Sequence, residues 1–139
     1  MHEDDHGDLT ATIRRIMPFC DVLGLTVVSA SPERVEATVD WTAERTTVFG
    51  GLHGGYVMAV ADSTGALCAA RNLPTGAGTS TIESKTNFLR PITSGTATVV
   101  STPVHVGRTT IVVQTEVIRD DGKTAAITTQ TQIVLPDRA

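Results

Sequence analysis

A histidine, five glycines and an aspartate lie within one short stretch, FGGLHGGYVMAVADSTGA at positions 49–66. Glycines such as Gly54 let a backbone approach a ligand closely where a helix begins. The first turn of a helix offers unpaired N–H groups and the positive end of the helix dipole, which suit a carbonyl oxygen acquiring negative charge. We therefore predict that the backbone N–H of Gly54 binds such an oxygen.

Asp62 interrupts the apolar part of this stretch. A buried carboxylate is unfavourable unless it is hydrogen-bonded or faces a cavity, so its position favours a catalytic role. The alternative is structural, because Asp-Ser-Thr-Gly is typical of caps and turns. In that case Ser63 and Thr64 would solvate Asp62 at a kink, or Asp62 would cap a second helix. The catalytic interpretation predicts instead that Asp62 faces a cavity at a subunit boundary.

Gly54 and Asp62 are too far apart to act together within one chain. Eight residues at 1.5 Å each separate them by roughly 12 Å along one helix, and a side chain that leans toward the helix start does not close this gap. If both act on one bond, they come from two subunits. A symmetric dimer with antiparallel central helices would bring Gly54 of one subunit against Asp62 of the other, twice.

The elements that position these residues follow from hydrophobic periodicity and turn signals. Residues 1–8 predict a flexible tail and residues 9–139 a single domain. A short helix is expected within 9–19, ending at or before Pro18. The further expected elements are strands at 23–30 and 34–41, a long helix at 53–71, and strands at 80–92, 95–107, 109–119 and 123–135.

Four sequential strands with tight connections, such as a turn at Asp121-Gly122, imply an antiparallel sheet. A helix that is apolar nearly all round must be covered on most sides. The sequence therefore predicts an α+β fold in which a curled antiparallel sheet surrounds one long central helix.

Composition excludes several classes of function. The 139 residues carry a net charge of −4 with only two lysines, which argues against a general nucleic-acid surface. No apolar run approaches the roughly 20 residues of a membrane span, and the start is acidic rather than signal-like, so we expect a cytoplasmic protein.

Cys20 and Cys68 lack metal-site spacing and are expected to be buried free thiols. His2 and His6 lie among acids in the tail, where weak metal binding has little support.

Four segments together carry a resemblance to a known family: FGGLHGGYVMAVADSTGALCAA, SKTNFLRPI, HVGRTT and DDGKTAAITTQT. They resemble the hotdog-fold acyl-CoA thioesterases of the phenylacetate-pathway and 4-hydroxybenzoyl-CoA group, over about residues 15–135. The resemblance implies hydrolysis of an acyl-CoA or aroyl-CoA thioester to the free acid and CoA. It implies no metal or other cofactor, since CoA is part of the substrate. It also implies a homo-oligomer, with the dimer as minimal active unit and a tetramer as the expected assembly.

The resemblance also assigns roles to individual residues. His53 and Gly54 match the family's helix-start pair, where the glycine N–H polarises the thioester carbonyl. Asp62 matches the catalytic carboxylate, acting as nucleophile or as general base toward water. Ser80 matches a partner residue in the strand after the helix. Thr47 stands where relatives commonly have Asn or Gln to hold the hydrolytic water; its hydroxyl offers a different set of hydrogen bonds.

The family binds the nucleotide end of CoA on the strands after the helix. Arginine suits phosphate because its planar fork forms paired hydrogen bonds. Lys85 lies nearby and fits a solvated surface charge equally well, and His105 also fits a purely structural role. The matching positions are Arg90, His105, Val106, Gly107, Arg108 and Thr109.

Two other functions remain open at this level. A hotdog hydratase or dehydratase acting on the acyl chain would need a His and an acid placed together, and no second His lies near Asp62 in the sequence. A non-catalytic acyl-CoA-binding protein is consistent with Thr47 at the water-holding position. The acyl preference depends on pocket shape, to which Phe49, Tyr56 and Met58 are expected to contribute.

Overall fold

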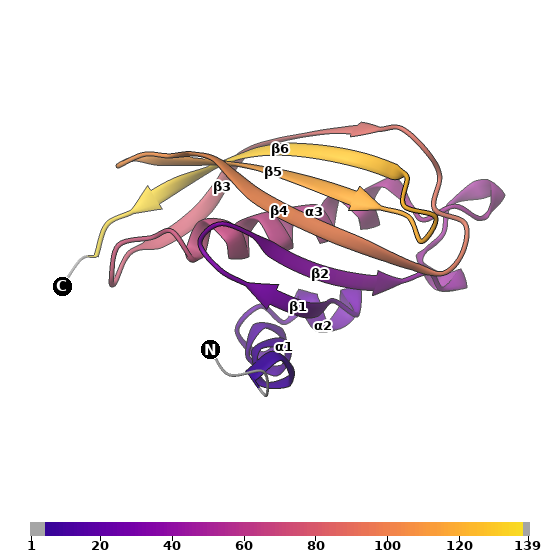
Figure 1. Cartoon of the computed structure of the whole chain (residues 1–139), viewed down its shortest axis with the longest axis horizontal. Helices are drawn as coiled ribbons and strands as arrows, with labels where there is room; N and C mark the ends of the chain where they lie inside the picture. The colour runs from indigo at the N-terminus through magenta and orange to yellow at the C-terminus, as the bar shows by residue number, and fades with distance from the viewer. Residues whose placement is uncertain (1–4, 138–139) are drawn as a thin grey trace.

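The computed structural model describes residues 5–137, and six of its strands form one antiparallel sheet. The elements are α1 (Asp5–Ile16), α2 (Phe19–Leu23), β1 (Thr26–Ala30), β2 (Val35–Asp40), the 3-10 helices η1 (Ala43–Arg45) and η2 (Val48–Gly50), α3 (Gly54–Ala70), β3 (Gly78–Phe88), β4 (Thr96–Val106), β5 (Thr110–Ile118) and β6 (Thr124–Leu135). The strand order is β1-β2-β4-β5-β6-β3, and the sheet curves around α3 (Figure 1). The predicted α+β architecture is confirmed.

The two N-terminal helices differ in detail from the prediction. Helix α1 begins at Asp5, within the segment 1–8 that was predicted as a tail, and residues 1–4 lie outside the described part. An acidic residue such as Asp8 suits the first turn of a helix because of the helix dipole. Helix α1 ends at Ile16, as the proline requires, and Pro18 then precedes the short helix α2, which the sequence did not reveal.

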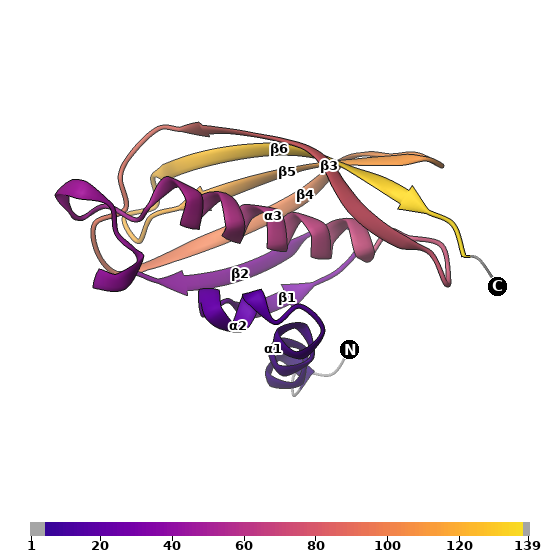
Figure 2. The ribbon, with the colours of Figure 1, turned by 180° about the vertical axis from the view of Figure 1, so that it is seen from behind.

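The turns between strands define two ends of the molecule. The β5–β6 turn, with Gly122 at a φ of 83° that favours glycine, lies at one end. The β4–β5 turn at 107–109 lies at the other. The loop before α3 lies at the first of these ends, and the C-terminal end of β6 lies at the second (Figure 1). Viewed from behind, α3 runs along the concave side of the sheet, with α1 and α2 beside β1 (Figure 2).

The inner face of the sheet is mainly apolar in one half and mainly polar in the other. Strands β2, β4 and β5 place aliphatic side chains such as Val35, Val99 and Val113 against α3 with no exposure. Strands β6 and β3 place threonines and glutamines there instead. The buried members are Thr128, Gln130 and Gln132, and Thr79, Thr81 and Thr86 are partly buried. The polar half of the interface therefore lies at the β3 edge of the sheet.

Candidate active site

The first turn of α3 presents its backbone as predicted. His53 is the N-cap residue, and its Nδ1 accepts a hydrogen bond from the N–H of Gly55 at 2.8 Å. Gly54 is the first residue of the helix, so its N–H lies ahead of any intrahelical acceptor, like all first-turn amides. The His53 cap thereby fixes the turn without using the Gly54 amide.

A cavity of about 350 Å³ opens at Gly54. Its lining residues are Leu52, Gly54, Val57, Phe88, Leu89, Arg90, Pro91, Ile92, Ala125 and Ala126. A Cβ on Gly54 would lie 3.3 Å from the ring of Phe88, so a side chain there would press on the aromatic wall. The absence of a side chain therefore keeps the cavity in contact with the helix start.

Asp62 lies on the side of α3 that the sheet leaves partly uncovered. It is half-buried and shares this side with Met58, which is 40% exposed, and with Ala66. Helix α3 continues without a break from Gly54 to Ala70, so the alternative in which Asp62 caps a second helix is wrong. Thr64 does not solvate Asp62 either, because its hydroxyl donates to the Val60 carbonyl at 2.8 Å.

The carboxylate of Asp62 accepts two hydrogen bonds on the same oxygen. Thr81 Oγ1 of β3 donates to Oδ1 at 2.7 Å, and Gln130 Nε2 of β6 donates to Oδ1 at 3.1 Å. Sequence reasoning identified neither residue. It selected Ser80, which is exposed and pairs with Ile133, on the face of β3 opposite to Thr81. The hydroxyl beside Asp62 is therefore that of Thr81.

Thr47 lies in the loop that leads into α3. Its N–H donates to the Gly51 carbonyl at 2.9 Å, and its side chain is exposed. In the same loop Phe49 adopts a left-handed φ of 69° with its side chain fully exposed.

The Arg45 guanidinium lies 5.3 Å from the ring centroid of Tyr56. A second, larger cavity of about 680 Å³ is lined by His53, Gly55, Tyr56 and residues of α2.

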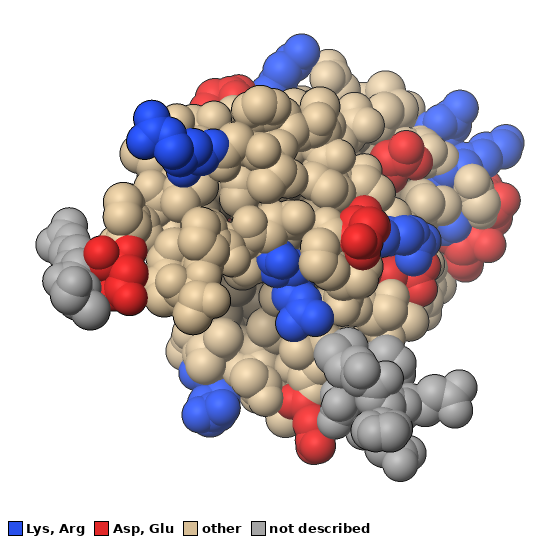
Figure 3. All heavy atoms as spheres, turned by 60° about the vertical axis from the view of Figure 1, so that its left-hand side comes forward, with Lys and Arg blue, Asp and Glu red and all other residues tan. Residues whose placement is uncertain are grey.

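The predicted CoA-binding residues divide between the two ends of the sheet. Arg90 lines the cavity at Gly54, whereas Gly107, Arg108 and Thr109 form the β4–β5 turn at the opposite end. The intervening strand β5 spans roughly 26 Å at 3.3 Å per residue. On the face shown in Figure 3, which brings the β4–β5 end forward, most of the surface is uncharged, and charged side chains of both signs lie close together toward its right-hand edge. Within one chain the two groups cannot contact the same phosphate.

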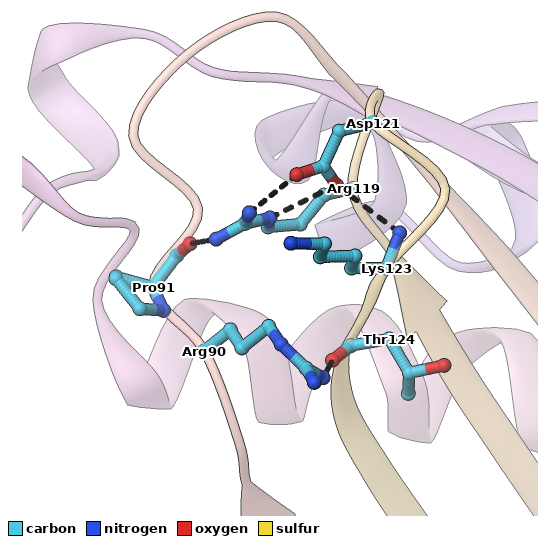
Figure 4. Close-up of polar contacts among 6 residues, drawn as sticks. All are labelled: Arg90, Pro91, Arg119, Asp121, Lys123 and Thr124. Carbon is cyan, nitrogen blue, oxygen red and sulfur yellow. Dashed lines mark hydrogen bonds and ion pairs between the residues drawn. The ribbon is translucent and has the colours of Figure 1, made fainter.

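Arg90 and Arg119 lie near each other, beside Pro91 and the start of β6, but they bind different partners (Figure 4). Arg119 pairs with Asp121 and also donates to the Pro91 carbonyl at 3.1 Å. The Arg119 hydrogen bond, followed by that of the Lys123 N–H, holds the pKa of the Asp121 carboxyl well below its usual range. Arg90 donates instead to the Thr124 carbonyl at 2.7 Å, which leaves its charge available to an anion.

Comparison with known proteins identifies the family. The sequence model of the Thioesterase superfamily matches residues 49–126. The chain belongs to this superfamily. Thioesterase HI1161 from Haemophilus influenzae superposes with a TM-score of 0.82 at 26% identity, over 91% of this chain and 92% of that one. A variant of thioesterase PA1618 from Pseudomonas aeruginosa superposes with a TM-score of 0.84 at 28% identity, over 91% and 94%.

The PA1618 sequence is 32% identical over 117 residues, which are 84% of this chain and 81% of that protein. These similarities confirm the hotdog fold and show that the protein is a thioester hydrolase. No helix among residues 5–137 of this thioesterase is long and apolar enough to cross a membrane.

Proposed function

We propose that this thioesterase hydrolyses acyl-CoA or aroyl-CoA esters at sites shared between two subunits. Asp62 of one subunit would act on the thioester carbonyl, while the Gly54 N–H and the helix dipole of the facing subunit stabilise the oxyanion. The observation that carries the proposal is the half-buried Asp62 carboxylate, held by hydrogen bonds on one oxygen and lying on the partly uncovered side of α3.

Antiparallel packing of two α3 helices also accounts for the divided CoA residues. A twofold axis across the helices exchanges the two ends of the molecule, so the 105–109 segment of one subunit approaches the Gly54 end of the other. Arg90 and Arg108 from different subunits would then lie on one side of one thioester. Charge-assisted bonds from both guanidinium groups suit the phosphates of CoA.

The chemistry can follow two routes from the same geometry. As a nucleophile, the carboxylate attacks the carbonyl carbon, the carbon–sulfur bond breaks to release the CoA thiolate, and water hydrolyses the resulting anhydride. As a general base, the carboxylate takes a proton from water, whose oxygen attacks the carbonyl directly, and the carbon–sulfur bond then breaks to release the CoA thiolate and the free acid. Thr47 would orient the water in either route.

The hydratase alternative has less support. The side chains that hydrogen-bond to Asp62 within residues 5–137 are a threonine and a glutamine, whereas proton transfer at two adjacent carbons calls for a paired histidine. His53, the histidine nearest to Asp62 in the sequence, uses its Nδ1 to cap α3. The non-catalytic alternative predicts tight CoA-ester binding without turnover, which an activity assay decides.

The first experiment measures thiol release from a panel of aliphatic and aromatic acyl-CoA esters. We expect Asp62→Asn to abolish turnover without changing the fold or the oligomeric state. Asp40→Asn is a matched control, because Asp40 also accepts a threonine hydroxyl, that of Thr96 at 2.7 Å, but lies exposed at the end of β2. Undiminished turnover by Asp62→Asn would exclude this mechanism.

A second experiment tests whether each site draws on two subunits. Gly54→Pro removes the amide hydrogen while proline remains compatible with the first helical position. Inactive Asp62→Asn and Gly54→Pro proteins, unfolded together in equal amounts and refolded, would recover about a quarter of wild-type activity if random dimers each rebuild one intact site. No recovery in verified mixed dimers would place both residues in one subunit's site.

A further inference from the structure

We infer that Gln130 and Gln132 of β6 are positioning residues that orient the Asp62 carboxylate, Gln130 directly and Gln132 through Thr81. The inference rests on the proposed catalytic role of Asp62. It adds two residues that lie beyond the segment 49–126 matched by the superfamily.

Both glutamines are buried with no exposure, on the inner face of β6. Burial of an amide is unfavourable unless its hydrogen bonds are replaced inside the protein. Aliphatic residues occupy the corresponding inner positions of the neighbouring strand β5, for example Ile111 and Val113. Polar side chains at 130 and 132 therefore need a local explanation, and Asp62 with its hydrogen-bond partners provides one.

The bonds around Gln132 fix the direction of the Thr81 hydroxyl. Gln132 lies opposite Thr81 in the β3–β6 register, and its Oε1 accepts from Thr79 Oγ1 at 3.0 Å. Its Nε2 donates to Thr81 Oγ1. Because that oxygen already accepts a hydrogen bond, the hydroxyl proton of Thr81 is directed to Asp62 Oδ1.

Gln130 contacts Asp62 at two atoms. Its Nε2 lies 3.1 Å from Oδ1 and 3.4 Å from the backbone carbonyl of the same residue. Its Oε1 is the buried side-chain atom without a hydrogen-bond partner among the described residues. The reverse orientation would point an amide oxygen at a carboxylate, so the unpartnered Oε1 follows from the Asp62 contact.

Gly65 makes this approach possible. It lies one helical turn after Asp62, and a Cβ at this position would be 1.9 Å from Gln130 Oε1. Only a residue without a side chain lets the amide rest against the α3 backbone. The glycine that suggested a turn in the sequence Asp-Ser-Thr-Gly thus accommodates the positioning residue.

Two donors on Oδ1 hold the carboxylate in one orientation and leave Oδ2 as the reacting oxygen. Other ionisable groups are oriented away from this site. Asp62 is the one charged residue of α3, and β6 has none. Cys20 faces Ser63 from α2, and burial raises the pKa of its thiol, so it stays neutral. The charged residues of β2, β3 and β5 lie on the outer face of the sheet: Glu36, Asp40, Glu83, Lys85 and Glu116.

The test separates kcat from KM on the best acyl-CoA ester. Gln130→Met and Thr81→Val each remove one donor with little change of shape. We expect each to lower kcat about tenfold with little change of KM, because one hydrogen bond to a charged group corresponds to about a tenfold effect. Gln114→Met is the control, since Gln114 lies exposed on β5 and should leave both constants unchanged.

A double-mutant cycle tests the indirect role of Gln132. Gln132→Met should lower kcat in the wild-type background and have no effect on kcat in Thr81→Val, because it acts through that hydroxyl. In the Gln130→Met background its effect on kcat should persist. A loss of packing alone would lower stability and kcat by the same factor in every background.

An unchanged kcat in Gln130→Met and Thr81→Val, with Asp62→Asn inactive, would overturn the inference and leave the proposed function standing. An active Asp62→Asn would overturn both. If Gln130→Met does not fold, the Thr81→Val and Gln132→Met cycle decides: equal losses of kcat by Gln132→Met with and without the Thr81 hydroxyl would refute its indirect role.

Discussion

Replacement of Gly65 by alanine should destabilise this thioesterase, although alanine normally stabilises a helix interior by about 1 kcal/mol relative to glycine. The new Cβ would lie 1.9 Å from Gln130 Oε1, more than 1 Å closer than Cβ atoms come in practice. Gln130 has no exposure and cannot move into solvent. Overpacking costs about 1–3 kcal/mol, and loss of the bond to Asp62 adds about 1.5 kcal/mol. After the gain of about 1 kcal/mol from alanine is subtracted, we expect a net loss of about 1.5–3.5 kcal/mol.

The assay is urea unfolding at one fixed protein concentration, because an oligomer's midpoint depends on concentration. Gly55→Ala is the matched control in the same helix. Its Cβ would lie 3.0 Å from the His53 ring, which is exposed and can shift by the few tenths of an ångström required while its Nδ1 still accepts the Gly55 N–H. We expect this variant to unfold at the wild-type urea concentration or above it. A Gly65→Ala protein as stable as Gly55→Ala would refute the packing of Gln130 against α3.

Two further predictions concern stability. Phe49→Gly should raise the free energy of unfolding by about 0.5–1 kcal/mol, because Phe49 holds a left-handed φ while its side chain is fully exposed. A lower urea midpoint would contradict this expectation. A higher midpoint together with a loss of turnover would show that the backbone strain at Phe49 serves the site. Burial raises the pKa of the Cys68 thiol from 9.0 to about 11. The unfolded chain therefore ionises first, and the stability contributed by the neutral thiol should be lost as pH rises from 9 to about 11. Cys68→Ala should make the unfolding midpoint less dependent on pH in this range, and an equally steep dependence would exclude Cys68 as its source.

The fold was largely predictable because its elements carry strong local signals. The apolar run before and after Asp62 predicts a helix at 53–71, and the structure has it at Gly54–Ala70. The Thr- and Val-rich segments became the expected strands. Helix α2 was missed because five residues are too few to show a helical period.

The site was predictable only where it depends on neighbours in sequence. The placement of His53 and Gly54 at the helix start follows from local chemistry. Thr81 does not, because β3 is polar on both faces, so alternation cannot tell which side chains point inward. Gln130 meets Asp62 through strand pairing with a segment far along the chain, for which a single sequence has no signal.

The polar half of the sheet has a consequence for how the molecule opens. An edge strand whose inner face carries mainly hydroxyl groups loses little hydrophobic stabilisation when it separates from the helix, so β3 should be the first strand to detach in local fluctuations. Its amide hydrogens would exchange with solvent sooner than those of β4 and β5, which lie over aliphatic core. Because Thr81 belongs to β3, each such opening also removes a donor from Asp62. The fraction of molecules in which Asp62 keeps its hydrogen bond from Thr81 therefore depends on how firmly β3 packs on α3. A second subunit that covers the β3 edge would raise that fraction without contacting the carboxylate.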